Sequence, residues 1–490
     1  MGETVSRFQV GFNKSVKIEA RPERITSEAG TLLAREAMET LGLLQFLDER
    51  LVDRRNRRQV THPLSELVAT SVLLKVQGLR DHDDADALRD DGAMRLAVSR
   101  RKGLDALGTR EPQQRERNKN PLHPDGLASQ PTLSRMVGMP STADNREALR
   151  DGLLHTASQR IREERRGRRI RYVTLDVDSL PVEVHGKQPG AQYNGHYGVR
   201  MFHPLVATIA ETGDIVDARL RPGSVHTAHG ALDFILPLVD KLEQQICQVA
   251  SIRMDAGFPD DTVLTGLESR SIPYVARIKK NAVLDDMAAP YLLSDSGVAS
   301  TEPDDIRFHE LTYKAQNWAE RRRVVLVTQR RDGELLRHHF FLITSWSTEQ
   351  IHADSLLALY RQRGTAESRM GELMDVLDPS LCSCPRQKSH YRNNVPQTRY
   401  PTCDSFANNE VLLLLSLLGY QVMHTLRTMM QKATGDGWSI RRLRERVLRV
   451  GARILVHARR AVVVIERASI RYWEPLFRQL HKLQCAPLGS

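Results

Sequence analysis

The stretch Tyr172-Val173-Thr174-Leu175-Asp176-Val177-Asp178-Ser179 alternates apolar and polar side chains along its length. Successive side chains of a β-strand point to opposite faces, so its three aliphatic residues would line a buried face. Asp176 and Asp178 would share the other face, close to the end of the strand. Before Arg171 the apolar residues follow a helical spacing instead, so the change of period indicates a domain boundary.

The segments after this strand alternate between strand-like and helix-like patterns. The sequence predicts a β-hairpin (201–209 and 215–220), a helix (228–242), a strand (251–255), a second helix (261–269) and a further strand (274–278). Strands interleaved with helices indicate an α/β fold with a mixed sheet flanked by helices.

Residues 304–345 depart from this rhythm, because three strand-like runs (309–313, 323–328 and 337–344) follow one another without a helical pattern between them. We interpret this stretch as a β-rich insertion into the α/β core. Helical spacing returns at 355–377 and at 408–430.

The two ends of the chain differ from this core. Residues 27–98 have helical spacing, whereas about 100–130 is rich in Gly, Pro and polar residues and is predicted to be a mobile connector. The sequence thus divides into a mostly helical N-terminal region (1–168), a first core part (169–298), the β-rich insertion (299–350), a second core part (351–430) and a basic C-terminal region (431–490).

The chain is basic, and its excess charge is clustered. Its 490 residues carry a net charge of +11 and give a pI near 9.5. Arginines gather at positions 54, 55, 57 and 58, between 160 and 171, and between 441 and 460. Three separate basic stretches favour an extended anionic ligand, such as a nucleic acid.

Cysteine usage and hydropathy favour a cytoplasmic protein. Five cysteines in a long chain do not indicate a disulfide framework, and Cys382, Cys384 and Cys403 lack a fourth zinc ligand at a customary spacing. The first sixteen residues lack the apolar core of a signal peptide. The apolar run 411–418 is shorter than a membrane span.

Three acidic positions lie at predicted element ends, where side chains are presented to substrates. The first is Asp178, with Asp176 as an alternative two residues earlier. The second is Asp255, which a small residue and a glycine follow, so that another group can approach closely. The third is Glu367, which shares one helical face with Tyr360 and Arg363 if the helix continues through the glycine between them.

Three carboxylates suit divalent-metal chemistry on phosphates. Mg²⁺ prefers oxygen ligands and is commonly held by a few carboxylates together with substrate phosphates. Two such ions, with Mn²⁺ as an alternative, assist an in-line displacement at phosphorus. Taken singly, each acid has a plainer interpretation: a solvated strand-end Asp, a helix-capping Asp and an ordinary surface Glu.

The order and context of these residues resemble a DDE-type insertion-sequence transposase with an RNase H-like core, and more narrowly the insertion-sequence-1380 family. The matching segments are LDVDS (175–179), HGKQ (185–188), YNGHYG (193–198), RLRPG (219–223), RMDAGF (253–258) and YRQRGTAE (360–367), with further likeness at 78–90, 127–135 and 448–460.

The resemblance implies that Asp178, Asp255 and Glu367 are the catalytic, metal-binding acids, with Asp176 as the rival for the first position. Tyr360 and Arg363 match two further positions of a Tyr-Arg-Glu-Lys signature that contacts DNA phosphates. The lysine is absent, because Met374 stands in its place. Arg369 is a candidate substitute for that phosphate contact.

Related transposases carry a β insertion between the second and third acids, and in some of them an aromatic residue there stacks on a flipped base. Trp318 and Trp346 are candidates for this role, because an indole offers a large stacking face. A core position between strands is the alternative for each of them. The loop 185–197 either contacts DNA or turns the chain, and His196 receives no catalytic role.

The resemblance implies metal-dependent cleavage at the element ends and transfer of the freed strands into target DNA. The helical N-terminal region and the basic C-terminal region are expected to bind the terminal inverted repeats and the DNA backbone, in a homodimer that holds two ends. A nuclease that cuts without joining, and an inactive or regulatory DNA-binding relic, remain alternatives. The missing lysine favours the relic.

Overall fold

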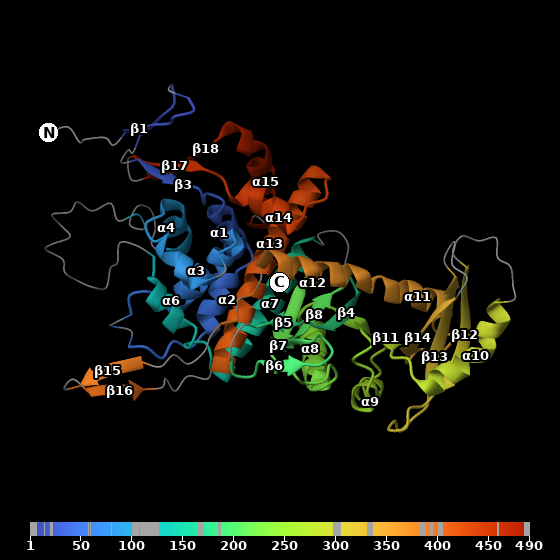
Figure 1. Ribbon diagram of the computed structural model, residues 1–490. Coiled ribbons are helices and arrows are strands. Elements are labelled where there is room, and N and C mark those ends of the chain that lie inside the picture. The colour runs from blue at the N-terminus through green and yellow to red at the C-terminus, as the bar shows by residue number, and fades with distance from the viewer. Residues whose placement is uncertain are drawn as a thin grey trace, which may run out of the picture. The chain divides into compact units, whose positions relative to one another are not determined.

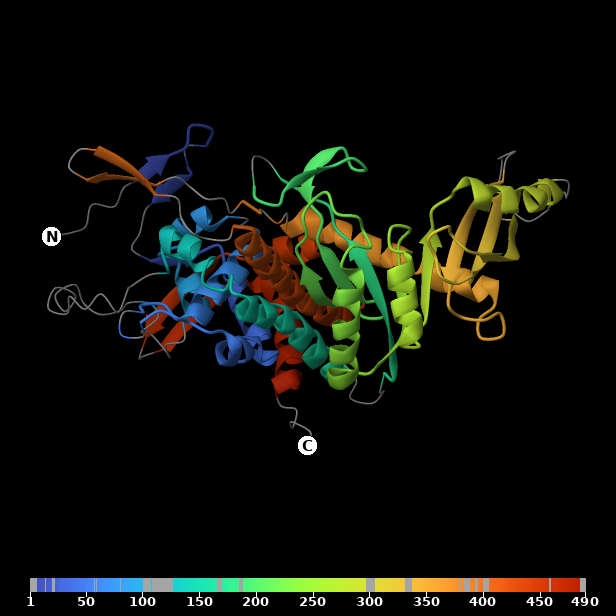
Figure 2. The same ribbon diagram turned by 90° about the horizontal axis from the view of Figure 1, so that it is seen from below.

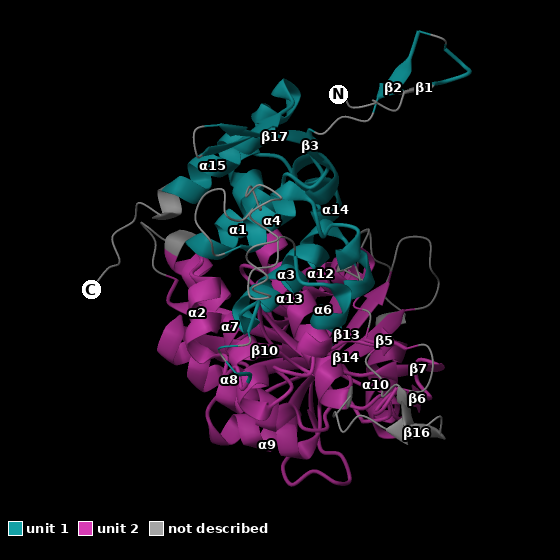
Figure 3. Cartoon of the chain, turned by 90° about the vertical axis from the view of Figure 1, so that its left-hand side faces the viewer, with its two compact units in different colours: residues 1–40, 55–134, 426–490 teal, residues 41–54, 135–425 magenta. Residues whose placement is uncertain are grey.

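The computed structural model divides the chain into two compact units (Figure 3). Unit 1 comprises residues 1–40, 55–134 and 426–490, and unit 2 comprises residues 41–54 and 135–425. The structure describes residues 7–13, 15–19, 23–56, 58, 60–79, 81–99, 107, 127–164, 170–184, 188–296, 305–330, 337–377, 379, 381–382, 388–392, 395–399, 405–457 and 460–484. Most of the predicted connector at about 100–130 lies outside the described residues.

Unit 2 is built on an eight-stranded mixed sheet in the order β12-β13-β14-β11-β10-β4-β8-β9 (Figure 1). Strands β4, β10 and β11 are parallel to one another, and the flanking pairs are antiparallel. The strands are β4 (Tyr172–Ser179), β8 (Leu205–Ile209), β9 (Ile215–Arg219), β10 (Gln248–Met254), β11 (Tyr274–Ile278), β12 (Asp305–Tyr313), β13 (Arg322–Arg330) and β14 (His338–Thr344). The predicted mixed α/β sheet is confirmed.

Helices cover both faces of this sheet (Figure 2). The aliphatic side of β4 packs in one apolar core with residues of α7 (Ala143–Glu164), α8 (Ala231–Gln245), α9 (Asp261–Ser269) and α10 (Ala282–Ser296). On the opposite face, Leu356 and Leu357 of α11 (Ala353–Arg361) pack against side chains of β11, β13 and β14. Because both faces of the sheet are buried by packed side chains, its strands are apolar over most of their length.

The three strands of the predicted β-rich insertion form, but they continue the central sheet. Strand β14 pairs with β11 over Val275 to Ile278, so β12, β13 and β14 extend one edge of the same sheet. The sequence pattern of these three strands did not predict which earlier strand they pair with, because sheet neighbours are set by tertiary packing.

The predicted strand 201–209 is divided in the structure. It forms β7 (Val199–Phe202) and β8, and the chain turns at His203-Pro204. Strand β7 belongs to a separate small sheet with β5 (Val182–Glu183) and β6 (Gln192–Asn194), in the order β5-β7-β6. The proline explains the division, because it lacks the N–H that a continuous strand would donate.

The long helix α13 (Ser405–Thr434) follows α12 (Arg363–Leu377) and the hairpin of β15 (Lys388–Arg392) and β16 (Val395–Arg399). By length and composition, Phe406–Thr434 could cross a membrane, but 94% of its most apolar window is buried within the protein. That burial agrees with a core helix.

Unit 1 combines both ends of the chain. Strand β3 (Arg24–Thr26) pairs with β17 (Ala452–His457), which pairs with β18 (Arg460–Ile465). Other elements of unit 1 include β1 (Arg7–Gln9), β2 (Lys17–Glu19), α1 (Thr31–Thr40), α3 (Leu64–Gln77), a 3₁₀ turn (His82–Asp86), α4 (Gly92–Val98), α14 (Ile440–Leu443), a π-helical turn (Arg444–Leu448) and α15 (Ile470–Gln484). Helix α2 (Leu43–Arg50) belongs to unit 2. Helix α6 (Gln130–Met136) crosses the boundary between the two units. The sequence had suggested separate terminal regions.

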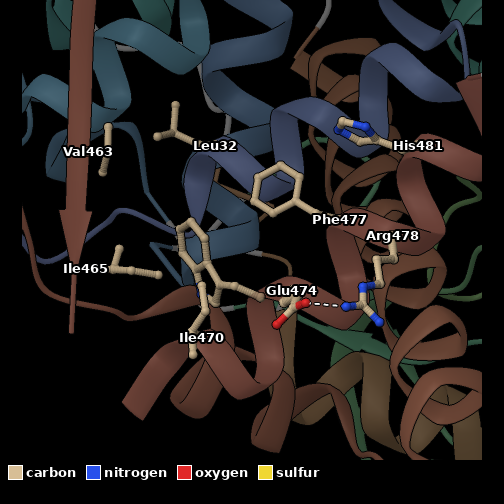
Figure 4. A pocket seen from close by; sticks show the side chains of 9 residues that line it. Leu32, Val463, Ile465, Ile470, Glu474, Phe477, Arg478 and His481 are labelled. Carbon is tan, nitrogen blue, oxygen red and sulfur yellow. Dashed lines mark hydrogen bonds and ion pairs between the residues drawn. The ribbon is translucent and has the colours of Figure 1, made fainter. Parts of the chain in front are cut away.

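An apolar groove of about 1010 Å³ lies within unit 1 between α1, β18 and α15. Figure 4 shows Leu32, Val463 and Phe477 around it, with Glu474 paired to Arg478 at one side. Its lining lacks the carboxylate cluster that the sequence analysis singled out.

Gly223 packs closely against the small sheet of β5, β7 and β6 in unit 2. A Cβ at Gly223 would lie 1.9 Å from the carbonyl oxygen of Met201 and 2.5 Å from that of Gln192. We expect Gly223→Ala to lower the free energy of unfolding by about 1–3 kcal/mol, because both obstacles are backbone atoms. Chemical denaturation measures this change. Gly371→Ala is the matched control, since nothing lies within 4 Å of its Cβ position in α12, and it should be neutral or stabilising; equal losses in the two variants would contradict the packing argument.

Candidate active site

Parallel pairing of β4 and β10 brings two of the predicted acids together. Arg253 stands opposite Asp176 and Met254 opposite Val177, so Asp178 and Asp255 follow at the same carboxyl edge of the sheet. Ligand and catalytic sites of open α/β sheets commonly lie at this edge.

Asp178 is held in a defined orientation at the end of β4. Its Oδ1 accepts a hydrogen bond from the Ser179 backbone N–H at 2.8 Å. Its Oδ2 accepts one from Nη2 of Arg363 at 2.7 Å. Asp255 is oriented in a similar way, because its Oδ1 accepts from the Gly257 backbone N–H at 2.8 Å.

Helix α12 brings the third acid to the same edge. The guanidinium of Arg363 donates through Nη1 to Oε1 of Glu367 and through Nη2 to Asp178. The Arg363 side chain is largely buried, whereas that of Glu367 is 59% exposed. One cation therefore already lies between carboxylates from a strand and a helix.

The charges at this edge oppose one another. The pKa of Asp178 is raised to about 6, mainly by burial; Arg363 opposes this rise, and the carboxylates of Asp255 and Glu367 contribute to it. Burial also raises the pKa of Tyr360, which lies within electrostatic range of Arg363, Asp255 and Glu367. Asp178, Asp255, Glu367, Arg363 and Tyr360 thus form one site.

Asp176, the alternative for the first acid, forms an ion pair with Arg253. Its carboxylate accepts from Nε of Arg253 at 2.6 Å and from Nη2 at 2.7 Å, and both side chains are almost fully buried. Nη1 of Arg253 also donates to the Leu359 carbonyl oxygen at 2.8 Å. The pair therefore joins β4 and β10 to the end of α11.

The helix predicted over 355–377 is interrupted, although the interruption is not at Gly364. Helix α11 ends at Arg361 and α12 begins at Arg363, with Gln362 between them. The Gln362 side chain lies 3.4 Å from Nη1 of Arg253. Tyr360 and Arg363 nevertheless remain at one site, because the backbone of Gln362 stays in the helical region.

The remaining predicted residues lie outside the carboxylate cluster. Trp318 is 6% exposed and packs edge-on against Tyr313, with the Arg322 guanidinium over its ring. It is a core residue, as the alternative interpretation held. Trp346 is half-buried at a second apolar cluster, and Met374 is half-buried on α12.

Arg369 points toward the turn between β8 and β9. Its Nη1 lies 3.4 Å from the Ala210 carbonyl oxygen, and its guanidinium packs on Gly213. It also lies within electrostatic range of Asp176. This arrangement places a positive charge within electrostatic range of the end of β4.

Two residues of the site were missed by the sequence analysis. Tyr197 and His203 are both within electrostatic range of Asp255. The loop 185–197 had been noted as rich in polar residues, and the repeated aromatic and glycine residues of 193–198 were the available signal. The sequence alone could not place that turn beside the end of β4, because the position of the turn depends on strand pairing in the small sheet of β5, β7 and β6.

The donor set suits a hard divalent cation. No group of three His, Cys, Asp or Glu side chains in the described parts of the chain is arranged to hold a metal ion. The Arg363 guanidinium is nevertheless a stand-in cation between Asp178 and Glu367, and carboxylate oxygens are the ligands that Mg²⁺ prefers. Replacement of the guanidinium by a metal would leave the same oxygens facing a positive charge.

Comparison with known proteins identifies the class. Residues 8–487 match the family model described as Transposase DDE domain group 1. The chain belongs to this family of transposases, which typically use divalent metal ions.

Other comparisons add little detail. No curated protein sequence matches the chain. One similar solved structure is described as a piggyBac transposase synaptic complex with hairpin DNA; it is 12% identical, with a TM-score of 0.35, over 94% of this chain and 83% of that chain. No residue role is transferred from so distant a match.

The buried pair of Asp176 and Arg253 should dominate local stability. Burial raises the pKa of Asp176 even though Arg253 opposes the shift, so the charges carry a desolvation cost. Asp176→Ala should lower the free energy of unfolding by about 3–5 kcal/mol, since it leaves a buried guanidinium unpaired. Arg253→Met should cost less, because Asp176 can take up a proton.

Denaturant titration measures both variants. The control is Asp240→Ala, which removes the surface ion pair with Arg270 and should cost far less, because solvent screens exposed charges. A buried-pair variant no worse than this control would refute the assignment of Asp176 and Arg253 as a structural pair.

Proposed function

We propose that this chain is an insertion-sequence transposase with an RNase H-like core, which cuts DNA at the element ends and joins the freed strands to target DNA. The carrying observation is the convergence of Asp178, Asp255 and Glu367 from two adjacent strands and one helix. Its likeness to the insertion-sequence-1380 family belongs to the same proposal.

In this proposal, Asp178, Asp255 and Glu367 hold divalent metal ions, of which Mg²⁺ fits best and Mn²⁺ is the alternative. Two such ions, when bound, supply positive charge to the attacking and leaving oxygens of an in-line displacement. Asp176 takes no part in metal binding, because Arg253 occupies both of its oxygens.

Arg363 exchanges partners on substrate binding. Its two donating nitrogens face carboxylates in the free protein, and the same fork can bind two oxygens of a phosphate. Tyr360 stays neutral at physiological pH, because burial raises its pKa, and it can donate a hydrogen bond beside Arg363. Arg369, on the same helix as Met374, adds positive charge within electrostatic range of Asp176.

The basic segments bind the DNA backbone. Within unit 1, the segment from α14 to β17 carries Arg441, Arg442, Arg446, Arg449 and Arg453, most of them exposed. Phosphate contacts of this kind weaken steeply with added salt. We propose that the terminal inverted repeats and target DNA are the partners, that a homodimer holds two ends, and that the protein acts in the bacterial cytoplasm on the nucleoid.

The test uses DNA duplexes made from the sequence that flanks this gene, incubated with the purified chain and Mg²⁺. We expect Asp178→Asn, Asp255→Asn and Glu367→Gln each to reduce cleavage and strand transfer by at least about 10³-fold while DNA binding persists, because only the metal ligands are lost. Gel assays separate bound, cut and joined DNA. Asp286→Asn, an exposed acid on α10, is the control and should retain activity.

The outcomes separate the alternatives. Cleavage without joining indicates a nuclease, and retention of DNA without cleavage indicates the regulatory relic that Met374 would permit. Full activity in any of the three acid variants would refute the site.

A further inference from the structure

The turn between β6 and β7 carries an aromatic residue to the carboxylates. Asn194 builds this turn: its Oδ1 accepts from the His196 backbone N–H at 3.0 Å, its carbonyl accepts from the Gly198 N–H at 2.8 Å, and its Nδ2 donates to the Gly223 carbonyl at 2.7 Å. Gly198 takes a φ of +71°, which glycine adopts without strain. Tyr197 is thereby presented from a preorganised turn.

Tyr197 lies within electrostatic range of both of the first two acids, Asp178 and Asp255. Its hydroxyl contacts the side chain of Ser179, the residue after Asp178. Burial raises the pKa of Tyr197, and Asp255 and Asp178 raise it further. Tyr197 is still 40% exposed, so the protein does not enclose it, and its phenol remains a neutral hydrogen-bond donor.

His203 supports this tyrosine from the buried side. The His203 side chain is 2% exposed, its Nδ1 lies 3.2 Å from the Val225 carbonyl oxygen, and its ring meets that of Tyr197 edge-on at 5.9 Å between centroids. Because a carbonyl can only accept, Nδ1 carries the proton. Its buried Nε2 has no hydrogen-bond partner among the described residues.

We propose that Tyr197 is a further catalytic residue, whose hydroxyl donates a hydrogen bond to a non-bridging oxygen of the scissile phosphate while His203 positions its ring. This inference rests on the proposed function and extends the site beyond its three acids, Arg363 and Tyr360. The chemistry follows from charge: the three acids can only accept hydrogen bonds or bind cations when ionised, and a phosphate needs donors. A neutral phenol supplies a donor without adding negative charge to a crowded site.

The experiment compares Tyr197→Phe, which removes only the hydroxyl, with Tyr197→Ala, in the cleavage assay on flanking-sequence DNA with Mg²⁺. A hydrogen bond to a charged group corresponds to about a 10- to 100-fold loss of rate. We expect Tyr197→Phe to show this loss with unchanged thermal unfolding and DNA binding. Tyr172→Phe, at the start of β4, the end opposite Asp178, and 57% exposed, is the matched control and should cleave at the native rate.

A modified substrate isolates the contact from a general structural effect. Single-isomer phosphorothioates replace one non-bridging oxygen at the scissile position by sulfur, which is a poor acceptor. With one isomer, the difference between the native chain and Tyr197→Phe should shrink to less than about threefold, since the hydrogen bond is already lost.

The outcomes bear on the two proposals separately. If the native chain cleaves but Tyr197→Phe cleaves equally well, this inference is overturned while the transposase proposal stands. A defect in Tyr197→Ala alone assigns ring packing and also overturns it, as does a Tyr197→Phe loss of the same size with both sulfur isomers. Failure of the native chain to cleave at all contradicts the proposed function itself.

Discussion

The geometry of the site depends on the buried ion pair between Asp176 and Arg253. A single guanidinium binds a carboxylate on β4, extends from β10, and donates to the backbone at the end of α11. The third acid is carried by the helix that follows. Two strands and a helix from distant parts of the chain are thereby held at one edge of the sheet, and small displacements of catalytic groups have large effects on rate.

The carboxylates that result from this arrangement repel one another. Asp178 stays difficult to ionise because it is buried beside two other acids, and Arg363 offsets only part of that cost. Such crowding is typical of functional sites, where local stability is given up for chemistry. In unit 2, the apolar packing of α7, α8 and α9 on the other face of the sheet supplies the stability that this edge lacks.

The sequence predicted local elements well where their periodicity was strong. Helix α9 and strand β11 match their predicted bounds, and Asp178 and Asp255 were placed at strand ends because an apolar run stops at each. The pattern could not distinguish Asp176 from Asp178, since both lie on one face; only the partner on the next strand separates them. Trp318 could not be assigned either, because burial depends on contacts with Tyr313 and Arg322. Tyr197 and His203 were missed because neither stands beside an acid in the chain.

The pairing of β3 with β17 has a consequence for synthesis. Thr26 lies opposite Ala452, so an early strand waits for a partner that the ribosome makes several hundred residues later. Contacts so far apart in sequence form slowly, and domains generally fold as units during translation. Unit 2 can assemble before unit 1 has all its strands, and a message cut short upstream of β17 yields a core without its companion. In this transposase, unit 1 can therefore be completed only after β17 has been made.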